Sequence, residues 1–217
     1  MSAKGRVLGA LGRLVLREGR VAQVIDLAPR LRRVVVTGDD LRGAVWVPGD
    51  KAQIVLPDRS VRTYTPCSWD AGAGATSFLV FVHGDAPGAA WGRTVRPGDP
   101  VRFLGPQRSL RAEGPCVVVG DETAFGLAQA LDAFGVFEVS DHAAAAAFVR
   151  EGRGVVVPRG DLLAVADQVA AVAAGRALVL AGRASSIQGL RPLLAARGVP
   201  WPKQVKAYWA DGKRGLD

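Results

Sequence analysis

Arg62 and Tyr64 stand two positions apart in the segment Arg62–Cys67, which reads RTYTPC. In an extended strand, residues at this spacing project from the same face. A guanidinium on that face can pair with a phosphate, and a phenol can lie against a flat ring. Thr65 adds a hydroxyl from the adjoining edge, and Thr63 lies between the two. The segment is therefore typical of a strand that binds a phosphorylated cofactor carrying an aromatic ring system.

A loop follows about twenty residues later, at 83–91, and reads HGDAPGAAW. A proline fixes its entry, and three small residues keep side chains away from a bound phosphate. The tryptophan can begin a helix whose N-terminal amides meet phosphate. Two alternatives are a solvated loop histidine and a tryptophan that packs in the core. The candidate residues of the loop are His83, Pro87, Gly88, Ala89, Ala90 and Trp91.

The segment Gly120–Thr123, GDET, comes where a buried apolar strand passes into a helix. In an open parallel sheet this is the place where nucleotides bind. Gly120 permits a close backbone approach, whereas Asp121 and Thr123 can also be plain helix caps. No base, nucleophile or metal cluster surrounds Glu122 or its neighbour, so we expect no catalytic side chain and no metal site. Hydride and electron transfer need neither, because a cofactor supplies the chemistry.

In this order, the three segments resemble the siderophore-interacting proteins, which are FAD-dependent ferric-siderophore reductases on the ferredoxin-NADP reductase scaffold. The resemblance runs from about Val21 to Trp209. It implies that Arg62–Thr65 holds the isoalloxazine and pyrophosphate of FAD, that the loop at 83–91 wraps the pyrophosphate, and that GDET faces nicotinamide. Further matches are Pro48–Asp50, Arg96–Val101, Leu104–Pro106, Val179–Gly182 and the pair Tyr208 and Trp209.

Three departures from the family pattern stand out. Ala86 replaces a glycine of the loop, and Gly88 with Ala89 replaces the usual pair of small residues. These two changes keep the backbone close to phosphate. Arg183 replaces a glutamate that commonly follows the Ala-Gly pair, so it bears on the nucleotide side. It can contact a 2′-phosphate or be an ordinary surface arginine.

The chain pattern predicts two domains after an N-terminal amphipathic helix at 1–20. Apolar and basic residues alternate at helical spacing over 4–18, which suits packing on the first domain or contact with a membrane surface. Six short runs broken by turns then predict a six-stranded antiparallel β-barrel, the FAD domain, at 21–113. From 114 to 217 strands and helices alternate, which predicts an α/β doubly wound parallel sheet for NADPH or NADH. The six expected barrel strands are Val21–Asp26, Leu31–Thr37, Ala52–Leu56, Val61–Thr65, Phe78–His83 and Pro100–Leu104.

The net charge of +8 arises mainly in residues 1–114. No nucleic-acid motif accompanies it, so a basic surface that attracts FAD, NAD(P)H and an anionic iron chelate is the preferred interpretation. No apolar run approaches the ~20 residues of a membrane-spanning helix, and two separated cysteines suit a reducing compartment, so we expect a cytoplasmic protein. The resemblance implies that a few basic residues at the cleft mouth bind the ferric siderophore. The candidates are Lys51, Arg108, Lys206 and Arg214, with Arg111 and Lys213 beside them.

The sequence thus predicts an FAD-containing, NAD(P)H-dependent reductase that releases Fe(II) from a ferric siderophore. Two alternatives remain open. One is a flavin or diaphorase-type reductase with another acceptor. The other is a non-enzymatic flavin- or siderophore-binding protein, motivated by Arg183 and the compact second domain.

Overall fold

The structure, a computed structural model, describes residues 16–149 and 153–213. The predicted helix at 4–18 therefore lies outside the described residues, apart from its last three positions. Those positions, Leu16–Glu18, are not helical, because they open the long strand β1. Arg214 also lies outside the described residues.

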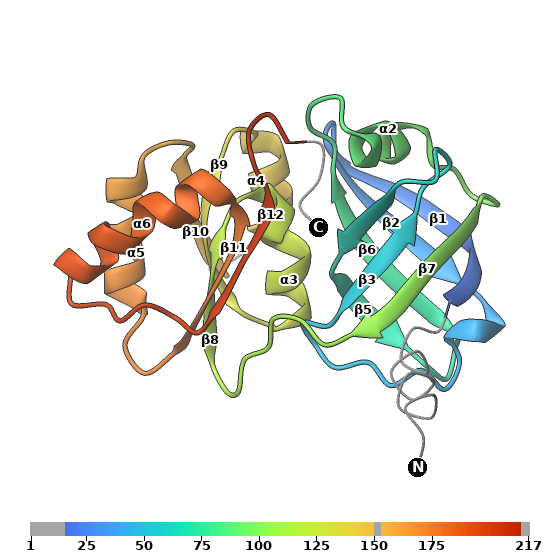
Figure 1. The fold of residues 1–217 in the computed structure, drawn as a ribbon, viewed down its shortest axis with the longest axis horizontal. Helices are drawn as coiled ribbons and strands as arrows, with labels where there is room; N and C mark the ends of the chain where they lie inside the picture. The colour runs from blue at the N-terminus through green and yellow to red at the C-terminus, as the bar shows by residue number, and fades with distance from the viewer. Residues whose placement is uncertain (1–15, 150–152, 214–217) are drawn as a thin grey trace, which may run out of the picture.

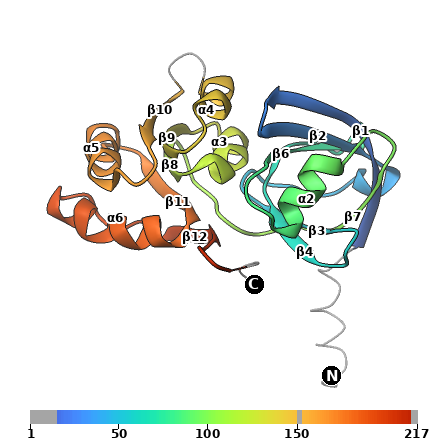
Figure 2. The same cartoon turned by 90° about the horizontal axis from the view of Figure 1, so that it is seen from above.

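The first sheet is antiparallel and runs in the order β4-β3-β7-β1-β2-β6-β5. Alternation of buried and exposed positions along its strands turns one face inward, as period-2 patterning requires. The sheet curves around this inner face (Figures 1 and 2). A short helix, α2, follows β6, and a 3-10 turn, η1, follows β2. The bounds are β1 Leu16–Ala28, β2 Leu31–Thr37, η1 Asp39–Leu41, β3 Lys51–Val55, β4 Val61–Tyr64, β5 Pro66–Asp70, β6 Ala75–Phe81, α2 Pro87–Thr94 and β7 Pro100–Gln107.

This sheet has seven strands where the sequence predicted six. The additional strand is Pro66–Asp70, which begins with a proline and follows β4 after a single residue. Proline is tolerated at the first position of an edge strand, where no ladder hydrogen bond is needed from its nitrogen. In the described part of the chain no ladder joins β4 to β5, so the predicted barrel is open at this seam. Thr65 lies at the seam.

The second sheet is parallel and runs in the order β10-β9-β8-β11-β12, which confirms the doubly wound pattern. The strand order reverses between β8 and β11, so their carboxyl ends form the switch point where nucleotides bind in such sheets. Helices cover both faces of the sheet (Figure 1). The bounds are β8 Cys116–Gly120, η2 Glu122–Ala124, α3 Phe125–Ala130, β9 Phe134–Val139, α4 His142–Phe148, β10 Gly154–Pro158, α5 Leu162–Val172, β11 Ala177–Arg183, α6 Ala184–Ala196 and β12 Gln204–Trp209.

An apolar cluster joins the two sheets, because α3 packs against β5 and β6. Leu79 and Phe81 of β6 share this cluster with Phe125 of α3. A methyl group at Gly126 would lie 3.2 Å from the carbonyl oxygen of Thr65, so the helix lies directly on the seam. Burial of this surface therefore fixes the open seam of the first sheet beside the carboxyl edge of the second.

Candidate functional site

A cavity of about 170 Å³ lies where the two sheets meet. It takes residues from β4, the end of β6, the loop and first turn of α2, the η2–α3 turn and the end of β12. Segments far apart in the sequence thus converge on one space. The lining residues are Arg62, Thr63, Tyr64, Thr65, Leu79, Phe81, His83, Ala86, Gly88, Ala89, Thr123, Gly126, Tyr208, Trp209, Ala210 and Lys213.

Arg62 and Tyr64 project from one face of β4, as their spacing predicted. A methyl group at Gly88 would lie 2.9 Å from the Tyr64 hydroxyl and 3.5 Å from Cγ of Arg62, so both side chains reach the first turn of α2. The Tyr64 ring packs against Trp91, with ring centroids 5.7 Å apart. Burial raises the pKa of the Tyr64 phenol well above its usual value, so the group stays neutral.

The first turn of α2 lies beside Arg62, and the amides of Ala89 and Ala90 donate to the carbonyl oxygen of Ala86. Ala86 is the N-cap and its side chain accepts no capping hydrogen bond, and Pro87 opens the helix. The glycine at 88 leaves a cradle that a Cβ would fill. A helix N-terminus beside a guanidinium suits a phosphate group. Together with the half-buried face of Tyr64, these groups fit the pyrophosphate and ring system of FAD.

The hydroxyl of Thr65 is 3.2 Å from the hydroxyl of Tyr208, which comes from the last strand of the other sheet. Burial raises the pKa of Tyr208 to about 12, so its hydroxyl remains protonated and can donate. The pair therefore joins the seam residue Thr65 of the first sheet to β12 of the second sheet. Tyr208 was named from the family resemblance, but this hydrogen bond was not predicted.

Asp121 and Glu122 turn inward instead of facing the cavity. Both are buried, at 1 % exposure. Asp121 accepts hydrogen bonds from the backbone and hydroxyl of Thr123 and from the backbone of Arg183. Glu122 accepts from the backbones of Ser140 and Asp141 and pairs with Arg159. Their carboxylates thus hold the carboxyl edge of the sheet together, and of this acidic segment only Thr123 lines the cavity.

Trp209 closes the cavity on the side of the parallel sheet. Its indole nitrogen donates to the buried carboxylate of Asp121 at 2.8 Å. The ring lies 5.2 Å from that of His83, which is itself stacked on Phe81. Burial lowers the pKa of His83, so the imidazole is neutral at pH 7. Burial raises the pKa of Asp121, although the hydrogen bonds that it accepts act in the opposite direction.

The remaining predicted cofactor residues do not line the cavity. Ala90 is on the exposed side of α2, and Trp91 is buried in the core of the first sheet behind Tyr64. Gly120 lies deeper in the second sheet, where a methyl group would come within 2.2 Å of the carbonyl oxygen of Ala181. Pro87 opens the helix but contributes no lining atoms. These positions shape the backbone around the cavity.

Known proteins support the flavin half of this interpretation. The model of the siderophore-interacting FAD-binding domain matches residues 57–110, which include β4, the loop and α2. Residues 57–110 resemble that domain. The expected resemblance is thereby confirmed, and it places the FAD-binding pattern over the first sheet and the cavity.

Solved structures share the whole two-sheet fold. A siderophore utilization protein from T. fusca is 24% identical, with a TM-score of 0.71 over 94% of this chain and 96% of its own. The siderophore-interacting protein SipS from Aeromonas hydrophila is 19% identical, with a TM-score of 0.73 over 91% and 92%. A ferredoxin reductase of carbazole 1,9a-dioxygenase is 17% identical, with a TM-score of 0.72 over 91% and 69%. No curated protein matches this chain.

Two of the predicted siderophore ligands lie close to the FAD-binding pattern and to each other. Burial lowers the pKa of Lys206, and the positive charge of Lys51 lowers it further. The ammonium of Lys206 donates to the hydroxyl of Ser109 at 3.1 Å. Arg108 is exposed, and Arg111 is engaged with the buried carboxylate of Asp50. Lys213, unlike these residues, lines the cavity between the two sheets.

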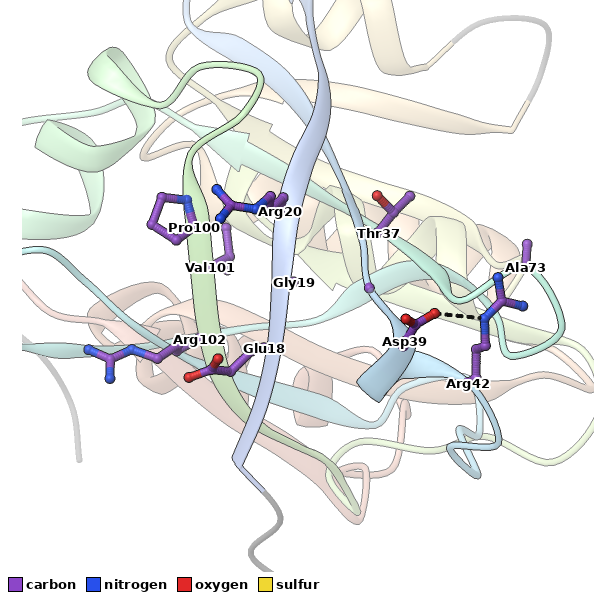
Figure 3. A pocket seen from close by; sticks show the side chains of 11 residues that line it. Glu18, Gly19, Arg20, Thr37, Asp39, Arg42, Ala73, Pro100, Val101 and Arg102 are labelled. Carbon is purple, nitrogen blue, oxygen red and sulfur yellow. Dashed lines mark hydrogen bonds and ion pairs between the residues drawn. The ribbon is translucent and has the colours of Figure 1, made fainter.

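A second hollow lies on another part of the first sheet, between β1, the start of β7 and the η1 turn (Figure 3). Acidic and basic side chains alternate there, and the Asp39–Arg42 pair crosses one rim. None of the predicted site residues lines this hollow. Within residues 16–149 and 153–213, no group of His, Cys, Asp and Glu side chains is placed to hold a metal ion. Over the same ranges, no helix is long and apolar enough to cross a membrane.

Proposed function

We propose that this protein is an FAD-containing reductase that takes electrons from NADH or NADPH and delivers them to Fe(III) bound in a siderophore. The observation that carries the proposal is the single cavity bounded by Arg62, Tyr64 and the N-terminus of α2, within the segment that matches the siderophore-interacting FAD-binding domain. The shared fold of ferredoxin reductases supports a reductase.

The residues of the cavity have separate tasks in this proposal. Arg62 and the N-terminus of α2 at Gly88 would bind the pyrophosphate of FAD, and Tyr64 would lie against its ring system. The hydrogen bond between Thr65 and Tyr208 holds the second sheet against the seam beside the same cavity. When bound, FAD would supply the redox chemistry, because a flavin can take up two electrons as a hydride and release them one at a time to two ferric ions. The protein needs no general acid or base for either transfer.

The nucleotide approaches from the parallel sheet, where β8 and β11 form the switch point. Trp209 and Thr123 line the face of the cavity that meets this edge. The hydrogen bond to Asp121 holds the indole in place. In our proposal, Trp209 therefore lies where the nicotinamide ring would have to bind for hydride transfer, so the two rings would stack or the indole would move aside.

The acceptor binds through positive charge near the seam. Burial lowers the pKa of Lys206, and repulsion by the positive charge of Lys51 lowers it further, so an anionic ferric siderophore would offset that repulsion. We assign binding of the ferric siderophore to Lys51, Lys206 and Lys213, with Arg108 at the edge of this site. Residues 21–113 and 114–217 are the FAD and NAD(P)H domains of the proposal, and the reaction takes place in the cytoplasm.

A second candidate is a flavin reductase with another acceptor, because the fold is shared equally well with a ferredoxin reductase. The two functions differ in the reduced product. Reduction of a ferric siderophore at a rate that depends on Lys51 favours the first, whereas reduction of dyes or proteins alone favours the second.

Arg62→Ala tests the flavin site. The substitution removes a charge-assisted hydrogen bond worth ~1.5–3 kcal/mol, so the dissociation constant for FAD should rise roughly tenfold to 150-fold. Titration of apoprotein with FAD, followed by quenching of flavin fluorescence, measures the change. Arg59→Ala is a matched control, because Arg59 is an exposed arginine in the turn before β4. A wild-type protein that cannot be loaded with FAD contradicts the proposal.

A further inference from the structure

Three arginines from three separate elements line one cavity of about 290 Å³ beside the flavin cavity. Arg30 lies in the β1–β2 turn of the first sheet, Arg159 directly follows β10, and Arg183 ends β11. Phe81, His83, Thr123 and Trp209 line both cavities, so the two spaces share a wall. A cluster of guanidiniums at the carboxyl edge of a parallel sheet is suited to an anionic ligand.

Arg159 is not fully satisfied by its protein partners. One terminal nitrogen pairs with Glu122, but Nε and the other terminal nitrogen are buried and have no hydrogen-bond partner. A buried donor without a partner is unfavourable. The guanidinium lies 5.5 Å from the centre of the Trp209 ring, which forms the shared wall. Arg159 therefore lines the cavity beside Trp209 and has donors that its protein partners leave unused.

Arg183 and Arg30 have partners that an anion can replace. Arg183 pairs with Asp211 at 2.8 Å, and Asp211 is 57 % exposed. Arg30 is 3.8 Å from Asp141 and 43 % exposed, and it lies over the ring of Phe81. Exposed ion pairs contribute little stability, so exchanging a carboxylate for a more highly charged group is favourable.

The turn after β8 offers no other means of binding phosphate. It reads Asp-Glu-Thr-Ala and contains no glycine-rich loop. The carboxylates of Asp121 and Glu122 occupy its interior, and Glu138 is buried nearby. The helices that follow are a three-residue turn and the six-residue α3. Phosphate recognition on this edge therefore falls to the arginines.

The position of the arginine cluster indicates which phosphate group of a pyridine dinucleotide it would bind. Arg159 and Arg183 both lie against the ring of Trp209, at 5.5 and 5.6 Å, and Trp209 borders the flavin cavity. In a pyridine dinucleotide the pyrophosphate is one ribose away from the nicotinamide, whereas a 2′-phosphate lies on the distant adenosine. A group this close to the site of hydride transfer is therefore the pyrophosphate.

We propose that Arg30, Arg159 and Arg183 form a subsite for the pyrophosphate of a pyridine dinucleotide, and that this subsite does not distinguish NADH from NADPH. The inference rests on the proposed function, because it takes the nucleotide as the electron donor. It assigns to Arg183 the role of a pyrophosphate ligand in place of a 2′-phosphate ligand. Asp211 then competes with the nucleotide for the same guanidinium.

Anaerobic calorimetry on the FAD-loaded protein, whose flavin is first reduced with dithionite so that it accepts no hydride, tests the proposal with inorganic pyrophosphate, ADP, adenosine 2′,5′-bisphosphate, NADH and NADPH as probes. Arg183→Gln should weaken pyrophosphate, ADP, NADH and NADPH by similar factors of about tenfold. Asp211→Asn should strengthen the same four, because it removes the competing carboxylate. Arg197→Gln is the matched control, since Arg197 is similarly buried and pairs with the exposed Asp167 away from the cavity. It should leave all five affinities unchanged.

Two results overturn the proposed subsite. If Arg183→Gln weakens the binding of only NADPH and the bisphosphate, Arg183 binds a 2′-phosphate. If Arg183→Gln leaves every affinity unchanged, the arginine cluster binds no phosphate. The proposed function is tested separately, by release of Fe(II) after chemical reduction of the bound FAD with dithionite. If the reduced wild-type protein releases no Fe(II) while Arg183→Gln and Asp211→Asn still change the affinities as expected, the ferric siderophore is not the electron acceptor. The pyrophosphate subsite is then still supported.

Discussion

Gly88→Ala is the substitution that best separates the flavin site from the stability of the fold. Gly88 lies in the first turn of α2 and faces β4. The added methyl group would be 2.9 Å from the Tyr64 hydroxyl and 3.5 Å from Cγ of Arg62. Either the turn moves away from β4 or the Tyr64 and Arg62 side chains move, and each response disturbs the phosphate cradle.

The two effects of this substitution on stability oppose each other. Alanine is favoured over glycine in a helix by about 0.5–1 kcal/mol. Overpacking against Tyr64 costs about 1–3 kcal/mol. The free energy of unfolding should therefore fall by ~0–2.5 kcal/mol, and the apoprotein should still fold. Loss of one charge-assisted phosphate contact, at ~1.5–3 kcal/mol, should weaken FAD binding roughly tenfold to 150-fold.

The assay pairs a fluorescence titration of apoprotein with FAD and a urea unfolding curve of the same sample. Ala90→Gly is the control, because Ala90 is exposed on the same helix and does not line the cavity. It should destabilise the helix by about 0.5–1 kcal/mol and leave the FAD affinity within about twofold. A Gly88→Ala protein that folds and binds FAD as tightly as wild type would refute the cradle.

Three other predictions address the seam, the core and the acceptor side. Tyr208→Phe removes the hydrogen bond to Thr65, so urea unfolding should show a loss of about 0.5–1.5 kcal/mol. Burial raises the pKa of Cys67 from 9.0 to about 12, so the unfolded chain releases the thiol proton at lower pH than the folded protein. Stability should fall as pH rises above 9, by about 1.4 kcal/mol at pH 10, and Cys67→Ala should lack this part of the slope. Lys51→Ala should raise the Michaelis constant for an anionic ferric siderophore in steady-state assays, and added salt should shrink the difference.

The architecture was largely predictable because its signals are periodic. Six short runs broken by turns predicted the antiparallel sheet, and the alternation of strands and helices from residue 114 onward predicted the parallel one. Pro66–Asp70 was missed because it is short, begins with proline and is separated from β4 only by Thr65. The start of β1, Leu16–Glu18, was assigned to a helix because Val7, Leu8, Leu11, Leu14 and Val15 have helical spacing and the predicted helix was extended to position 18.

Parts of the site were predictable from spacing and parts were not. The shared face of Arg62 and Tyr64 follows directly from strand geometry. The inward direction of Asp121 and Glu122 does not, because it depends on donors from Arg183, Ser140 and Trp209 that the chain brings together only in three dimensions. The same holds for the bond between Thr65 and Tyr208, which joins residues 143 positions apart.

The arginine cluster of the cavity beside Trp209 was the feature least predictable from the sequence. Arg30 and Arg159 have no motif around them and appear as ordinary surface arginines in the sequence. Their convergence on Trp209 depends on the packing of the first sheet against α3 and α4. Arg183 was noticed only because it departs from a family pattern.

One measurement tests the central claim most directly. Anaerobic stopped-flow mixing follows the flavin absorbance of the FAD-loaded protein, first with NADH or NADPH and then with a ferric siderophore and a ferrous-ion chelator. The account predicts bleaching of the flavin band by the nucleotide, followed by its return together with the ferrous complex. A flavin that neither nucleotide bleaches, or a bleached flavin that ferric siderophores leave unchanged, would contradict it.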